Sequence, residues 1–227
     1  MSISNLISLN QQWLPILAVF LLPIFTLFLF KSKKRTEGPK LPPGPRRLPI
    51  IGNFHQLGDR PYYDFWKMSQ KHGPVMRVQL GRSPGVVISG AEASREAMKD
   101  HDLDTCSRPL SVGPGTTIFI NAYAIGREPS KWENPEEFYP ERFENSDVDY
   151  RGSYFELVPF GAGRRTCPGL AMGTTAVKYT LANLLYGFDF ELPNGKKFED
   201  FPMEEAGGPT IHNKHDLVLI PKKHEWD

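Results

Sequence analysis

The chain has 227 residues, a formal net charge of +1 and 40 % apolar residues. That length is enough for one globular domain of ordinary size or for two small ones. A net charge near zero gives no indication of nucleic-acid binding, and two cysteines are too few for a disulfide framework. The 21 prolines exceed the average usage of about 5 %, and several of them mark boundaries between elements.

Residues 13–30 form an uncharged, mainly apolar run near the lower length limit of a membrane-spanning helix. By the positive-inside rule, the basic residues that follow place the rest of the chain on the cytosolic side: Lys31, Lys33, Lys34 and Arg35. A cleaved signal peptide is the alternative, but its basic residues would precede the apolar run and a small-residue cleavage site would follow. We therefore predict a single-pass transmembrane anchor within residues 1–30.

Residues 31–49 are first basic and then rich in proline, with Pro42, Pro43, Pro45 and Pro49. Prolines at this density stiffen and extend a chain. We interpret this segment as a hinge between the anchor and the folded part.

The first folded part, residues 50–112, has patterns typical of helices and a β-hairpin. Gly73 and Pro74 mark the end of its first helix, and Ser89 is a candidate cap for the second. In chain order, the predicted elements are a helix over 61–71, a strand over 75–80, a turn over 81–85, a strand over 86–88 and a helix over 91–99.

Residues 160–169 are the most informative stretch, because they place Cys167 in a glycine-rich loop, beside two arginines, at the start of a helix. A cysteine thiol has a pKa of about 8.5, so only a few per cent is thiolate at neutral pH. Nearby cations and a helix N-terminus both favour the thiolate, which is the form that binds metals. The alternative is that Cys167 is a small buried apolar residue, which is the commonest fate of a free cysteine.

The helix after this loop is predicted to run for about five turns, with Pro168 in its first position and Gly187 at its end. Strands are predicted over 188–192 and 217–220, with a turn over 193–195. The helix has one apolar stripe, made of Leu170, Val177, Leu181, Leu184 and Phe188.

The loop as a whole fits the pattern Phe-x-x-Gly-x-Arg-x-Cys-x-Gly, which closely resembles the haem-binding loop of the cytochrome P-450 family. The resemblance implies that Cys167 is the axial thiolate ligand of the iron in haem, an iron protoporphyrin. It also implies that Phe160 packs near the sulfur and that Arg165 pairs with a haem propionate. The cofactor-binding positions would be Phe160, Gly163, Arg165, Cys167 and Gly169. Thiolate ligation pushes electron density onto the iron and favours O–O cleavage.

Most of the remaining chain resembles two separate parts of the same family, particularly its plant microsomal members. Residues 61–109 resemble the family's beginning, whereas residues 115–129 and the element Pro140–Phe143 resemble a segment shortly before the cysteine loop. The two parts join near residues 110–114, so the middle of a usual member is absent. We expect an incomplete α+β fold, mainly α with small β-sheets, in which residues 50–112 are the β-rich N-terminal part and residues 113–227 the haem-ligand part.

By the same resemblance, the missing middle contains the helix of the dioxygen site, a helix that holds a propionate, and a Glu-x-x-Arg helix that binds the arginine equivalent to Arg142. No catalytic residue beyond the haem ligand would survive. We expect Arg142 to turn to water or to pair with Glu141, and we expect apolar surface to be exposed. The pattern Glu92-x-x-Arg95 is interpreted as a solvated helix face rather than as the missing helix.

Two further patterns receive structural interpretations. The spacing from His212 to His215 predicts a solvated loop rather than a metal site, because no other ligand cluster accompanies it. Gly161 and Gly163 lack the third glycine and the strand–helix unit of a dinucleotide site.

The leading interpretation is an endoplasmic-reticulum haem-thiolate monooxygenase with a cytosolic folded part, present as an internally deleted form. The family inserts one oxygen atom from dioxygen into a small apolar substrate and takes electrons from an NADPH-dependent reductase, an acidic partner that Arg164 and Arg165 could face. For this chain we expect weak or absent haem binding and little or no turnover. The alternatives are a catalytically inactive, membrane-anchored remnant and a gene-model error.

Overall fold

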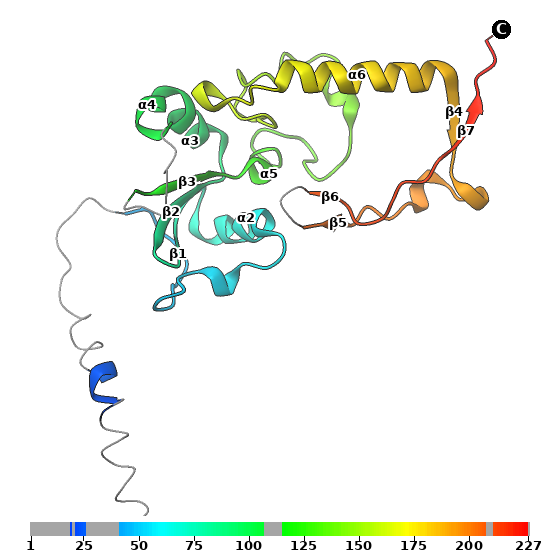
Figure 1. Cartoon of the computed structure of the whole chain (residues 1–227). Helices are drawn as coiled ribbons and strands as arrows, with labels where there is room; N and C mark the ends of the chain where they lie inside the picture. Colours follow the sequence, from blue (N-terminus) through cyan, green and yellow to red (C-terminus); the bar gives the residue numbers. More distant parts are fainter. Residues whose placement is uncertain (1–18, 20, 26–40, 107–114, 208–210, 227) are drawn as a thin grey trace, which may run out of the picture. The chain divides into compact units, whose positions relative to one another are not determined.

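The computed structural model describes residues 19, 21–25, 41–106, 115–207 and 211–226 (Figure 1). The chain divides into two units, residues 1–41 and residues 42–227. In the first unit, residues 19 and 21–25 are helical, and the rest of the predicted anchor lies outside the described residues. In the part of the chain that the structure describes, no helix has the length and apolar character needed to span a bilayer.

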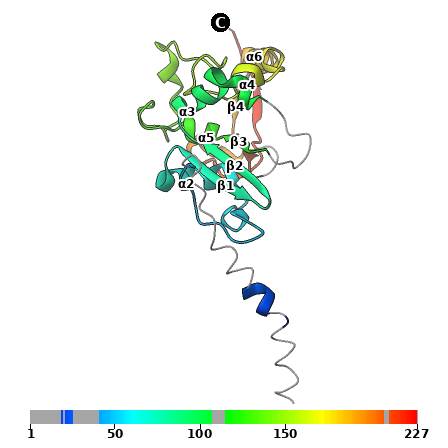
Figure 2. The same ribbon diagram turned by 90° about the vertical axis from the view of Figure 1, so that its left-hand side faces the viewer.

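The second unit is built around a three-stranded sheet of β1 (Val75–Leu80), β2 (Ser83–Ile88) and β3 (Thr117–Ile120), drawn side by side in Figure 2. β1 and β2 form the predicted antiparallel hairpin, although β2 begins at Ser83 because Gly81 and Arg82 suffice for the turn. β3 pairs parallel to β2, with Gly85 opposite Thr117 and Ile88 opposite Ile120. This strand, which follows the predicted junction, was not foreseen from the sequence.

Among the described residues, six helical elements precede, connect or follow the strands of this sheet. They are η1 (Phe54–Gln56), α2 (Pro61–His72), α3 (Ala91–Arg95), the π-helical stretch η2 (Glu96–Asp100), α4 (Asp102–Thr105) and α5 (Ala122–Ile125). Helix α2 starts with Pro61 at its first position and ends at His72. The next residue, Gly73, has a φ of 93°, which glycine adopts without a side-chain clash.

The predicted cap of α3 is wrong, because its N-cap residue is Gly90 and the Ser89 hydroxyl is buried without a hydrogen-bond partner among the described residues. The cap comes instead from Glu128, whose carboxylate accepts a hydrogen bond from the Ala91 N–H at 2.9 Å. A carboxylate in this place also compensates the positive end of the helix. The start of α3 is thus held by a residue from the other side of the junction.

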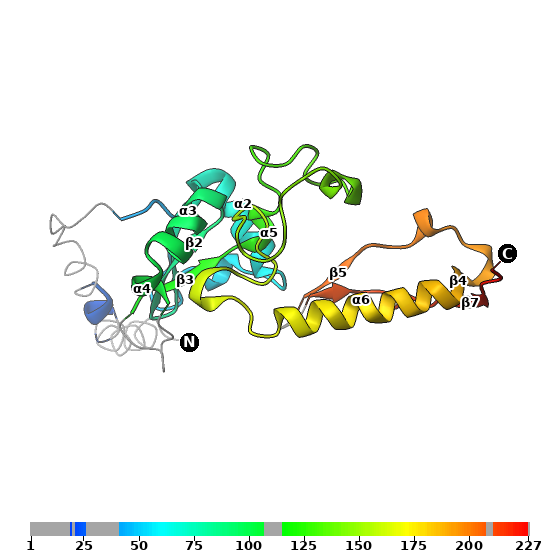
Figure 3. The ribbon, with the colours of Figure 1, turned by 90° about the horizontal axis from the view of Figure 1, so that it is seen from above.

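The C-terminal part contains α6 (Leu170–Gly187) and two small sheets. β4 (Phe188–Glu191) leaves the end of α6 and pairs antiparallel with β7 (Ile220–Lys223), as Figure 3 shows. The strand predicted over 217–220 therefore begins later, because β4 is short and its last residue, Glu191, is opposite Ile220. The elements that complete this part are η3 (Pro140–Phe143), η4 (Gly163–Arg165), η5 (Pro193–Gly195), η6 (Phe198–Asp200), β5 (Glu205–Ala206) and β6 (His212–Asn213).

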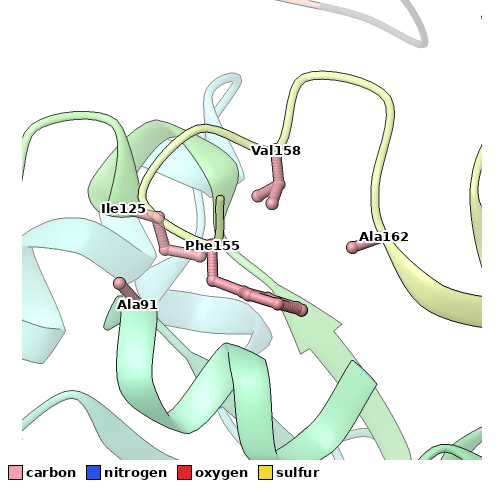
Figure 4. Close-up of a cluster of buried hydrophobic side chains, with 5 residues drawn as sticks. All are labelled: Ala91, Ile125, Phe155, Val158 and Ala162. Atoms are coloured by element: carbon pink, nitrogen blue, oxygen red, sulfur yellow. The ribbon is translucent and has the colours of Figure 1, made fainter. Parts of the chain in front are cut away.

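Two buried clusters form the core. The first lies between α2 and the sheet and contains Phe65, Met76, Val78 and Val87. In the second, side chains of the segment before α6 meet α3 and α5 (Figure 4), and its members are Ala91, Ile125, Phe155, Val158 and Ala162. Because this second cluster joins residues from both sides of the junction, the two parts fold as one unit.

Helix α6 contributes nothing to these clusters. None of its residues, all of which the structure describes, is buried, and Met172 is 77 % exposed. The helix begins at Leu170, so the expectation that Pro168 is its first residue is wrong. Its apolar side chains are the exposed apolar surface that the sequence predicts.

We predict that Met76→Ala lowers the free energy of unfolding by about 2–5 kcal/mol, because the Met76 side chain is fully buried. The matched control is Met172→Ala in α6, which should change the free energy of unfolding by less than about 0.5 kcal/mol. Urea unfolding followed by circular dichroism measures both. Equal losses would contradict the placement of the core beneath β1 and the exposure of α6.

Candidate functional site

The segment that leads into α6 closes on itself as a narrow loop. The Cys167 N–H donates to the carbonyl of Phe160 at 2.9 Å, and the Leu170 N–H donates to the carbonyl of Cys167 at 3.3 Å. Within the loop, both the N–H and the hydroxyl of Thr166 donate to the carbonyl of Gly163. These bonds hold the exposed thiol of Cys167 just before the N-terminal end of α6.

The loop closes through glycines whose backbone conformation or close contacts other residues could not adopt. Gly161 and Gly163 have φ values of 70° and 62°. A Cβ atom at Gly163 would overlap the carbonyl oxygen of Met98, so the loop approaches η2 in a way that only glycine allows. A Cβ atom at Gly169 would lie 3.8 Å from the Cys167 sulfur, so the backbone there runs beside the thiol.

Phe160 lies at the other end of the closure. Its ring meets the ring of Tyr150 edge to face, with the ring centroids 6.1 Å apart. Tyr150 in turn accepts a hydrogen bond from Lys178 of α6 at 3.4 Å, and this bond lowers the pKa of the Tyr150 hydroxyl. The loop and the third turn of α6 are therefore connected through one tyrosine.

The two arginines of the loop are both engaged by the segment that ends at Cys106. The Nε of Arg164 forms an ion pair with Asp102 at 2.6 Å, and Arg165 donates a hydrogen bond to the carbonyl of Cys106. Arg165, the residue expected to pair with a propionate, is thus directed at a backbone oxygen. Nothing in the sequence pattern indicated either contact, because each spans about 60 positions along the chain.

Arg142 neither turns to water nor pairs with Glu141, so that expectation is wrong. Its half-buried guanidinium lies 5.9 Å from the ring centroids of Trp132 and Tyr139 and donates four hydrogen bonds to backbone carbonyls. The acceptors are Tyr139 at 3.0 Å, Glu133 at 2.8 Å, Asn134 at 3.2 Å and Glu137 at 2.9 Å. The loop before η3 curls around the guanidinium and supplies acceptors in place of a carboxylate, beside a cavity of about 610 Å³.

The remaining sequence patterns occupy exposed positions. Glu92 of the Glu-x-x-Arg pattern forms an exposed ion pair with Lys131 at 3.2 Å, the kind of pair that contributes about 0–1 kcal/mol. His212 lies in β6 rather than in the predicted loop, and His215 lies 3.7 Å from Glu204. Among the described residues, no group of three or more histidine, cysteine, aspartate or glutamate residues could hold a metal ion.

A side-chain hydrogen bond also connects the C-terminal part to α2. The Tyr62 hydroxyl donates to the Glu205 carboxylate at 2.6 Å. Burial, together with this hydrogen bond, raises the pKa of Tyr62 to about 12. The contact joins α2 to β5, although the two residues are 143 positions apart in the sequence.

The loop suits one axial ligand and one face of a flat cofactor. Cys167 presents an exposed sulfur, and a helix N-terminus and the close backbone of Gly169 lie beside it. These residues thus fit a haem group from the thiolate side only.

The family model for cytochrome P-450 matches residues 42–113 and 104–220. The chain belongs to the cytochrome P-450 family, whose cofactor is haem held by a thiolate. The two matches meet at residues 104–113, beside the junction predicted near residues 110–114.

Curated relatives reveal how much of the family's length is absent. The chain is 30 % identical to 2-methylbutanal oxime monooxygenase of Manihot esculenta over 511 aligned positions that span all of both chains, and 227 residues fill fewer than half of them. It is 54 % identical over 131 residues to 4-hydroxyphenylacetaldehyde oxime monooxygenase of Sorghum bicolor, covering 58 % of this chain and 24 % of the relative. With cytochrome P-450 71A1 of Persea americana, the identity is 53 % over 126 residues, covering 56 % and 25 %. The latter two alignments span about a quarter of each relative.

We predict that Gly163→Ala destabilises the chain by about 1–3 kcal/mol, because alanine at a φ of 62° is strained and its Cβ would meet the Met98 carbonyl. Gly173→Ala is the control, since a Cβ there meets nothing within 4 Å and alanine favours a helix by about 0.5–1 kcal/mol. Thermal unfolding of both variants tests this. A Gly163→Ala variant as stable as the parent would show that the loop does not approach η2 closely.

Proposed function

We propose that this chain is the cysteine-loop part of a haem-thiolate monooxygenase, with Cys167 as the axial ligand of the haem iron. One observation carries the proposal: the exposed Cys167 thiol, held by the closure to the Phe160 carbonyl just before α6. The family membership of residues 42–220 supports it. Haem, when bound, would supply the reduction of dioxygen and the insertion of one oxygen atom into a small apolar substrate.

The chain's own residues would bind and orient this group from one side. Cys167 would provide the thiolate, and the N–H groups at the start of α6 would stabilise its charge. Arg165 would pair with a propionate only after releasing the Cys106 carbonyl, to which it donates in this structure. Phe160 would shield the sulfur from water at the other end of the closure.

Electrons would come from an NADPH-dependent reductase. Arg164 and Arg165 are both exposed on the loop, and their positive charges would suit an acidic partner. In this structure, Arg164 pairs with Asp102 and Arg165 donates to the Cys106 carbonyl. An endoplasmic-reticulum location, with residues 1–30 as a membrane anchor, is also part of the proposal. The uncharged run over 13–30 and the basic residues that follow it support that location.

A second function, a catalytically inactive remnant, has its own support. Helix α6 has no buried residue, and more than half of the positions aligned with the Manihot relative have no residue of this chain opposite. A flat apolar cofactor needs cover on both faces, since apolar area left in water loses about 25 cal/mol per Å² of stabilisation. We therefore expect the chain to hold haem weakly or not at all.

We predict that the reduced, haem-supplemented chain gives little or no stable red-shifted Soret band when carbon monoxide is added. The physical reason is the missing cover on the face opposite Cys167. Absorbance spectra of the parent, of Cys167→Ala and of Cys106→Ala measure this. A stable band that Cys167→Ala abolishes and Cys106→Ala retains would prove the weak-binding prediction wrong and establish the thiolate ligand.

We further predict that the chain, mixed with an NADPH-dependent reductase and haem, shows no product formation above that of Cys167→Ala. Suitable substrates are the two oximes named for the relatives from Manihot and Sorghum. Mass spectrometry of the products provides the measurement. NADPH-dependent product that Cys167→Ala abolishes would rule out the inactive remnant.

A further inference from the structure

The cysteine loop has one ion pair with a residue far away in the sequence. The Nε of Arg164 lies 2.6 Å from the Oδ2 of Asp102, and the two residues are 62 positions apart. The Asp102 side chain is 25 % exposed and that of Arg164 60 % exposed, so the carboxylate is partly shielded from water. Shielding strengthens the attraction relative to an ion pair in open solvent.

Neighbouring residues of the loop contact the same part of the chain. Ala162 is buried in the cluster that contains Ala91, and Gly163 approaches the carbonyl of Met98. Arg165 then donates to the carbonyl of Cys106. Four successive loop residues, 162–165, thus meet residues 91–106, and Figures 1 and 3 show the segment before α6 next to α4.

Asp102 is distinguished from the other acidic residue of the same short helix. Asp104 has an 85 % exposed side chain and lies 4.0 Å from His101 within its own turn. Among the described residues, the Asp104 carboxylate therefore has no recorded partner beyond His101, the residue just before α4. Asp104 is a natural control, since it has the same side chain on the same helix without the contact to the loop.

We propose that Asp102 is a positioning residue for the cysteine loop. By holding Arg164, it fixes the loop against α4 and so sets the place of Cys167 before any cofactor is bound. Asp102 lies in the first segment that matches the family and Arg164 in the second. The ion pair therefore positions the loop without help from the absent middle, and this inference goes beyond the proposed haem site because it applies to the chain without haem.

Limited proteolysis of the full 227-residue chain, with no haem added, tests the proposal. Trypsin cleaves after arginine and lysine, and both Arg164 and Arg165 are held when the ion pair is formed. Asp102→Asn should speed cleavage after these two residues about threefold, as expected from losing one partly exposed ion pair. The substitution leaves the sequence around the cleaved bonds unchanged, so it alters the loop's exposure and not its chemistry.

Mass spectrometry measures the rate of cleavage after Arg164 and Arg165. Two cleavages serve as internal references, one after Arg82 in the hairpin turn and one after Lys178 in α6. The expected result is faster loop cleavage in Asp102→Asn with both references unchanged, no change in Asp104→Asn, and recovery in Asp102→Glu. The proposal is overturned if Asp102→Asn and Asp104→Asn behave alike, or if all sites accelerate together, which would reveal general destabilisation. Because no haem is present, a failure of haem binding leaves this result unaffected.

Discussion

The parallel pairing of β2 with β3 is the interaction on which the rest of the second unit depends. Gly85 makes it possible, because a Cβ there would lie only 2.9 Å from the ring of Phe119. The pairing continues beyond the strands, where the Asn121 N–H donates to the Ile88 carbonyl at 2.8 Å and the Asn121 amide donates to the Tyr62 carbonyl at 2.9 Å. α5 is thereby held against α2, and the segments that follow it, including the cysteine loop, start from a defined place.

Around the candidate site, the cysteine loop is packed against the rest of the second unit, whereas α6 is exposed along its length. The loop is closed by its own hydrogen bonds, packed through Ala162 and tied to Asp102, whereas α6 projects no side chain into a core. Membership of the cytochrome P-450 family and the local geometry of Cys167 therefore agree with each other. The proposed haem group would be covered on the side of Cys167, whereas α6 adds no buried side chain to cover its other face.

The features that could be predicted from the sequence are those set by nearby residues. The hairpin follows from alternation and a glycine turn, the length of α6 from its apolar spacing and Gly187, and the character of the cysteine loop from its glycines and arginines. The features that were missed depend on residues distant in the chain. β3 exists because β2 offers an edge, the cap of α3 comes from Glu128, and the loop's arginines meet Asp102 and Cys106. Arg142 was misjudged for another reason, because a missing carboxylate was assumed to leave the guanidinium without acceptors.

The distance along the chain between β2 and β3 also sets an order of events during synthesis. β2 ends at Ile88 and β3 begins at Thr117, so residues 89–116 must be added before the sheet can close. At the usual elongation speed of the ribosome, this takes roughly 1 to 6 seconds. For that interval the hairpin presents an unpaired edge, and such an edge can pair with another nascent chain. On a polysome, where nascent copies of the chain lie close together, the edge of β2 is therefore open to such pairing.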